Sequence, residues 1–295
     1  AGYSSNGSSH DMVIWRYNPD GTLDTTFNGT GYVVHDNAAG GNGNDYGNAI
    51  TLDGFGSIYV AGYSNNGADE DMVIWKYAPD GTLDTTFNAP NGFVVADGGF
   101  GDDMGNAITI DLSGRVLVTG YSIGDGSGQD MVIWAYNADG TLDTLNFNNP
   151  VGYVVHDNAA GGLSHDVGYA ITVDTSGRIL VTGASINSDP DWDMVIWAYN
   201  ADGTLDTLNF NNPVGYVIHD SAAGGATHDT GWGITTDTFG RVLVSGSSMN
   251  ATDLDMVIWR YAADGTLDNS FNGTGFLVHS NAAGGYGDDL GFAIK

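Results

Sequence analysis

The sequence lacks cysteine, and it holds only 6 prolines and one glutamate, Glu70, in 295 residues. Without cysteine there is no disulfide, no thiolate metal ligand and no cysteine nucleophile. The apolar runs, such as residues 12–15 and 116–118, are far shorter than the roughly 18 residues of a membrane-spanning helix. We therefore expect a soluble chain without membrane insertion.

Basic residues are also scarce. Only 7 Lys and Arg face 36 Asp and Glu, which gives a formal charge of −29. Binding to nucleic-acid phosphates or to an anionic membrane surface depends on clustered Lys and Arg, and this chain has no such cluster. The composition therefore predicts no nucleic-acid partner.

The chain does contain enough apolar residues to form a core, and it is rich in residues that favour turns. Hydrophobic residues make up 41% and glycine contributes 46 residues, so the acidity does not indicate disorder. Glycine, asparagine and aspartate between short apolar runs are typical of many short strands joined by tight turns.

Internal repeats set the expected fold. The motif Asp-Met-Val-Ile-Trp begins five times, at residues 11, 71, 130, 193 and 255, at intervals of about 60 residues. Each copy is followed by Asp-Gly-Thr-Leu-Asp, first at residues 20–24. Two further blocks repeat around it: Gly-Asn-Ala-Ile-Thr from Gly47, whose last counterpart runs from Gly291 to Lys295, and Ile-Tyr-Val-Ala-Gly-Tyr-Ser from Ile58.

Each repeat therefore contains four short apolar segments rich in Val, Ile, Tyr and Trp, a composition typical of β-strands. Met-Val-Ile-Trp is apolar on both alternating faces, so we expect that strand to be covered on both sides. The prediction is an all-β protein with one domain over residues 1–295, a five-bladed β-propeller of four-stranded antiparallel blades. The predicted blades are residues 47–97, 105–157, 168–220 and 231–280, with a fifth built from both termini; a linear β-solenoid is the rival.

The stretch from Asp11 to Gly31, with Gly-Asn-Ala-Ile-Thr and Gly-Arg-Val-Leu-Val-Thr-Gly-Tyr-Ser, resembles the delta-sixty repeat family of bacterial β-propeller-like proteins. The likeness covers essentially the whole chain. It implies a propeller in large secreted or surface proteins and brings no catalytic residues. The third and fourth copies depart from the pattern with Leu-Asn-Phe-Asn-Asn-Pro, which lengthens a loop.

Aspartates recur at three places that an antiparallel blade brings to one face of the disc. They precede strand one (Asp45, Asp103, Asp166, Asp229, Asp289), open strand three (Asp11, Asp71, Asp130, Asp193, Asp255) and close strand four (Asp36, Asp97, Asp157, Asp220). Such carboxylates suit Ca²⁺, which takes six to eight oxygen ligands in flexible geometry, although no EF-hand loop is present. The candidate Ca²⁺ ligands are Asp36, Asp45, Asp157, Asp166, Asp193, Asp220, Asp229 and Asp255. The alternative is that these residues cap turns through the backbone.

Histidines near the same face, His35, His156, His219 and His279 at the end of strand four, are expected to be hydrogen-bonding partners more than transition-metal ligands. The five Trp of the repeated motif are expected to pack between blades. Catalysis is not expected, because glycosidase chemistry usually needs a carboxylate pair with a glutamate acid, and Glu70 has no counterpart in any other copy.

Two functions remain open. The first is a non-enzymatic extracellular structural or surface protein that assembles with itself into a fibre, tube or layer, with cations bridging the acidic surface. The alternative is a surface adhesin or lectin that binds carbohydrate through repeated loops; no exposed aromatic recurs in every copy to stack a sugar ring.

The repeats at the two ends of the chain lead to one further prediction, which concerns closure of the ring. Aligning Gly291 on Gly47 and Ala1 on Ala61 leaves the circle without equivalents of residues 52–60. The incomplete blade near Ala1 and Lys295 predicts a strand contributed by a neighbouring subunit or by flanking sequence. The simpler alternative is that strands one and three shift together, or that the chain belongs to a longer array.

Overall fold

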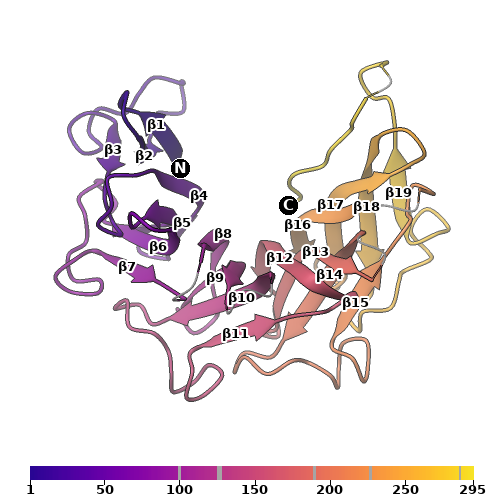
Figure 1. Cartoon of the computed structure of the whole chain (residues 1–295). Helices are drawn as coiled ribbons and strands as arrows, with labels where there is room; N and C mark the ends of the chain where they lie inside the picture. Colours follow the sequence, from indigo (N-terminus) through magenta and orange to yellow (C-terminus); the bar gives the residue numbers. More distant parts are fainter. Residues whose placement is uncertain (99–100, 125–127, 189–190, 226–227, 286) are drawn as a thin grey trace. The chain divides into compact units, whose positions relative to one another are not determined.

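A computed structural model of the chain describes residues 1–98, 101–124, 128–188, 191–225, 228–285 and 287–295, with backbone alone for 163 and 164. All regular structure in this part of the chain is β, in nineteen strands. The strands fall into two compact units, residues 1–126 with 133–143 and residues 127–132 with 144–295 (Figure 1). None of the described residues forms a helix able to cross a membrane.

The first unit begins with a three-stranded antiparallel sheet of β1 (Gly2–Ser5), β2 (His10–Trp15) and β3 (Tyr32–His35). A four-stranded antiparallel sheet follows, made of β4 (Asp45–Leu52), β5 (Ile58–Asn65), β6 (Glu70–Tyr77) and β7 (Phe93–Ala96). The hairpin of β8 (Asp103–Ile110) and β9 (Val116–Ile123) comes next. Strand β10 (Gln129–Tyr136) has residues in both units.

The second unit holds β11 (Tyr153–His156) and two further four-stranded antiparallel meanders. One consists of β12 (Gly161–Val173), β13 (Ile179–Asn187), β14 (Trp192–Tyr199) and β15 (Tyr216–His219). The other consists of β16 (Asp229–Thr236), β17 (Val242–Met249), β18 (Leu254–Tyr261) and β19 (Phe276–His279). Gln129 of β10 forms a parallel bridge with His165 of β12.

These sheets confirm the all-β prediction and the four strands per repeat. Three predicted blades, 47–97, 168–220 and 231–280, correspond to the sheets that start with β4, β12 and β16. The predicted blade 105–157 has β8 and β9 in the first unit and β11 in the second. The three strands β1–β3 correspond to strands two to four of a blade, and the segment aligned with strand one, residues 291–295, lies in the second unit.

The repeated apolar strand is covered on both faces, as its sequence predicts. Met72, Val73, Ile74 and Trp75 of β6 are all fully buried. One side faces the preceding sheet: a core cluster joins Met12, Ile14, Phe27 and Val33 to Val60, Val73 and Trp75. The same contact repeats in the second unit, where Met194, Ile196 and Phe210 pack with Val244, Val257 and Trp259. Apolar junctions between successive sheets therefore hold each unit together.

Candidate functional site

Each four-stranded sheet has two chemically different ends. At what we call the acidic end, strands one and three start; for β4–β7 this end includes Asp45, Asp71 and Asp97. At the hairpin-tip end lie the loops that join strand one to two and strand three to four, residues 53–57 and 78–92 in the same sheet. The predicted calcium ligands all belong to the acidic end.

The aspartates that open strand one bind the backbone of the loop before them. Asp45 accepts N–H hydrogen bonds from Asn37 at 3.0 Å and Ala38 at 3.3 Å. Asp166 and Asp229 accept the equivalent pairs, from residues 158 and 159 and from residues 221 and 222. Burial raises the pKa of Asp229 to about 6, although the hydrogen bonds from Ser248, Ser221 and Ala222 oppose this shift. For Asp45, Asp166 and Asp229 the structure therefore shows the turn-capping interaction, and a metal role stays a prediction.

The aspartates that open strand three accept an amide from the loop between strands two and three. Asn66 donates to Asp71 at 3.0 Å and Asn250 to Asp255 at 2.9 Å. In Asp71 and Asp255 the other carboxylate oxygen, Oδ1, is buried and has no hydrogen-bond partner. Asp193 differs, because Asn187 contacts both of its oxygens.

The predicted ligands after strand four are the most open of the set. Asp157 and Asp220 are exposed and accept hydrogen bonds from their neighbours Asn158 and Ser221. Asp36 is exposed as well, and its pKa is raised by partial desolvation and by the charges of Asp11 and Asp45.

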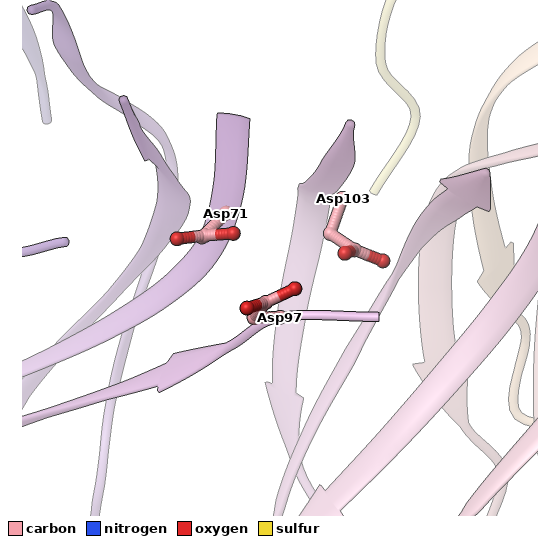
Figure 2. Close-up of side chains that lie close together, drawn as sticks. All are labelled: Asp71, Asp97 and Asp103. Atoms are coloured by element: carbon pink, nitrogen blue, oxygen red, sulfur yellow. The ribbon is translucent and has the colours of Figure 1, made fainter. Parts of the chain in front are cut away.

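Two groups of three carboxylates lie close enough to share an ion in the described residues. Asp191, Asp193 and Asp220 form one, so the structure brings together two of the predicted ligands, with Asp191 added. Asp71, Asp97 and Asp103 form the other, and none of these three was among the predicted ligands (Figure 2). In each group one oxygen of every residue lies within 4.8 Å of the others. Asp71, Asp97 and Asp103 occupy the repeated aspartate positions of the sequence. This repetition was the signal that could have identified them as candidate ligands.

The histidines at the end of strand four bind tyrosines of the next sheet. Nδ1 of His35 lies 3.0 Å from the Tyr77 hydroxyl, and His156 and His219 make the same contact with Tyr199 and Tyr261. Burial lowers the pKa of all three histidines to about 4, so they are neutral at pH 7. These three confirm the expected hydrogen-bonding role.

At the hairpin-tip end many of the aspartates are paired with bases. Six of the seven basic residues flank these loops: Arg16, Lys76, Arg115, Arg178, Arg241 and Arg260. Arg115 contacts Asp111 at 2.7 Å and Asp143 at 3.3 Å, and all three are nearly buried. Arg178 repeats the arrangement with Asp174 and Asp206. The charge of the hairpin-tip end is thus partly compensated, while aspartates such as Asp20 and Asp80 bond to threonine and not to a base.

The hairpin-tip end also exposes large apolar side chains and one cleft. Exposed residues at the loop tips are Phe55 (92%), Leu112 (73%), Leu145 (76%), Leu208 (77%) and Phe239 (80%). In the second unit a cleft of about 520 Å³ lies between the hairpin-tip loops of the two meanders. Its lining includes Thr175, Arg178, Asn200, Asn209 and Asp264. Repetition of the motifs did not predict the exposed tips, because the tip residues vary between copies.

Repeated four-stranded antiparallel meanders, packed face to face through apolar junctions, define a β-propeller repeat protein. The sequence matches the family described as "Domain of unknown function (DUF5122) beta-propeller" at residues 1–27, 56–87, 113–145, 175–208 and 240–271, which is more than half of the chain, and it belongs to this family. Residues 39–67 also match a family described as "Beta-propeller repeat".

No curated protein matches the sequence. Among solved structures, a fucose lectin from Kordia zhangzhouensis in complex with methyl-fucoside matches with a TM-score of 0.33 and 14% identity. The match covers 61% of this chain and 99% of that chain. A likeness at this TM-score carries no functional argument.

Proposed function

We propose that the chain is a closed five-bladed β-propeller of the delta-sixty repeat type that serves as a non-enzymatic structural protein of an extracellular surface and associates with further copies of itself. The observation that carries self-association is the set of apolar side chains exposed at the hairpin-tip end. Burying one such side chain is worth about 1.5–3 kcal/mol, so exposed apolar tips favour contact with another surface.

Hydrogen-bonded turns fix the backbone of the loops that carry the exposed phenylalanines. Asp53 accepts the Phe55 N–H at 2.8 Å, and Asp237 accepts the Phe239 N–H at 2.9 Å. Asp237 is itself held by Arg241, at 2.6 Å. Because these Asx turns fix the backbone, the two phenylalanines are presented to solvent without a large loss of loop entropy on contact.

The distribution of charge also favours the hairpin-tip end as the surface for self-association. A net charge of −29 makes two copies repel, and the repulsion is strongest between acidic ends that carry few or no basic residues. At the hairpin-tip end ion pairs such as Arg16 with Asp24 and Arg241 with Asp237 offset part of the negative charge, so two copies repel each other less there. A second copy of the chain therefore meets less repulsion at this end than at the acidic end.

The combined variant Phe55→Ser with Phe239→Ser tests self-association, with Thr238→Ser in the same loop as control. In sedimentation and light scattering, the wild type and the control should form species larger than the 30.8 kDa monomer, and the double variant should shift to the monomer. A wild type that stays monomeric over the whole accessible concentration range contradicts the proposal, as does assembly unchanged in the double variant.

The cleft favours carbohydrate binding as a second candidate. It is lined by asparagine amides, carboxylates and a guanidinium, which are the groups that hydrogen-bond sugar hydroxyls. Thr175 is exposed in its lining, so Thr175→Trp should fill the cleft and abolish retention of any glycan that the wild type binds on an array. If the Thr175→Trp variant still retains the glycan, the sugar binds at another site of the protein.

A further inference from the structure

Three carboxylates in the first unit converge from three separate elements. Asp71 lies on β6, Asp97 follows β7, and Asp103 opens β8, the first strand after the β4–β7 sheet. Figure 2 shows the three side chains around one small space. Asp71 and Asp103 are 3% and 1% exposed, whereas Asp97 is exposed to solvent. The group is therefore mostly dry and open on the Asp97 side.

The buried Asp71 carboxylate is only half satisfied. Its Oδ2 accepts a hydrogen bond from Asn66 at 3.0 Å, while Oδ1 is buried and has no partner. A carboxylate oxygen out of contact with water and without a hydrogen bond is costly, because its charge is uncompensated. The charges that act on Asp71 are those of Asp97, Asp69 and Asp103, all acidic. A cation at Oδ1 would compensate this charge.

The other three-carboxylate group does not share this feature. There, both oxygens of Asp193 contact Asn187, and Asp191 accepts the His228 N–H. The sequence supplies a second difference: strand β7 ends in Ala96, where β3, β11, β15 and β19 end in histidine. The group of Asp71, Asp97 and Asp103 itself offers carboxylate oxygens only, which suits a hard cation.

We propose that Asp71, Asp97 and Asp103 bind one Ca²⁺ ion, which joins the β4–β7 sheet to β8. This inference goes beyond the proposed function and does not depend on self-association. Asp71 and Asp103 supply buried oxygens, Asp97 closes the site from the solvent side, and water completes the six to eight ligands of the ion.

The test is isothermal titration of the intact, chelator-treated chain with CaCl₂, together with its melting temperature with and without Ca²⁺. Asp97→Asn is the test variant, because Asp97 is exposed and the substitution keeps its shape. Asp157→Asn, at the equivalent position of another repeat, and Asp220→Asn, in the second group, are the controls. We expect wild-type binding at about 10⁻⁴ to 10⁻³ M, the range of extracellular calcium modules.

The Asp97→Asn variant should bind Ca²⁺ at this site about tenfold or more weakly and should lose the Ca²⁺-dependent rise in melting temperature. Both control variants should keep the wild-type affinity for Ca²⁺ at this site and the Ca²⁺-dependent rise in melting temperature. Binding that is unchanged in Asp97→Asn, or lost only in Asp220→Asn, overturns the assignment, and so does the absence of Ca²⁺ uptake by the wild type up to about 10 mM, well above the weakest affinities known for such modules.

Discussion

Aspartate, the dominant charged residue, is used in opposite ways at the two ends of each sheet. Burial raises the pKa of Asp111 as it does that of Asp229, but hydrogen bonds from Ser113 and Arg115 and the Arg115 charge leave the pKa of Asp111 below its ordinary value. Hydrogen bonds from Ser113 and the Arg115 backbone, together with the Arg115 guanidinium, stabilise the Asp111 anion, whereas Asp229 has hydrogen bonds but also the repelling charge of Asp220.

A pH-dependent loss of stability follows at Asp111. Asp111→Asn should lower the free energy of unfolding at pH 7 by about 2 kcal/mol, because the buried Arg115 loses one of its carboxylate partners. Since the folded-state pKa of Asp111 is depressed, its contribution is full above the ordinary Asp pKa near 4 and is lost as pH falls through the folded value. The difference between wild type and variant in urea unfolding should therefore shrink below about pH 4. A difference that is constant down to pH 2 would show that the pair contributes no proton linkage; the exposed Asp157→Asn serves as control.

At the scale of the strand, the first strand of each four-stranded sheet carries a bulge that only glycine on its neighbour tolerates. The register of β4 and β5 shifts between Gly47 and Ala49, and Gly62 of β5 lies opposite. A Cβ at Gly62 would collide with the Tyr46 carbonyl oxygen, and Gly120 and Gly183 meet Met104 and Val167 in the same way. The bulge therefore depends on a specific glycine in β5, β9 and β13.

Gly62→Ala should lower the free energy of unfolding by about 2–4 kcal/mol, because the clash is with backbone and cannot be relieved by a rotamer. Gly54→Ala, in the loop before β5, is the matched control: its Cβ would meet nothing within 4 Å, and its φ is not positive. Denaturant midpoints of the two variants check this. Equal stability of both would mean that the bulge relaxes freely.

The sequence was sufficient for the strands and insufficient for the carboxylate groups. Four apolar runs per repeat predicted four strands, because period and turn residues are local properties. The predicted blade start at residue 47 missed the first residues of β4, since Asp45 pairs with Ser64 although its sequence is typical of a loop. The group at Asp97 was missed for another reason. Only five residues lie between Asp97 and Asp103, against eight between Asp36 and Asp45, and the effect of that shorter connection on side-chain distances is not local.

At the scale of the whole molecule, the first and last sheets each carry an incompletely covered face. Trp15 and Tyr17 are 39% and 59% exposed, whereas Trp75 and Tyr77 at the same repeat positions are 0% and 3% exposed. On the last sheet Met256, Ile258 and Phe271 are half-buried, whereas Met12, Ile14 and Phe27 are buried. These are the two halves of the junction that repeats inside each unit.

The C-terminal segment continues that junction. Gly291 packs on Met256 and donates its N–H to the Gly246 carbonyl, and Gly47 packs on Met12 and on the Gly2 carbonyl in the same way. The equivalence of Gly291 and Gly47 that the repeats predicted is thus confirmed. In a closed ring, Tyr17 would then meet His279, the last histidine of the strand-four series, as Tyr77 meets His35.

Closure therefore predicts an interaction energy between Tyr17 and His279. A double-mutant cycle of Tyr17→Phe and His279→Ala should give a coupling of about 0.5–1.5 kcal/mol, the size of one hydrogen bond, equal to that of a reference cycle on Tyr77 and His35. Both cycles are measured by urea unfolding at two protein concentrations, because a junction completed by a second copy makes the coupling depend on concentration. Zero coupling at Tyr17 and His279, beside a normal value at Tyr77 and His35, would show that the ring does not close through its own termini.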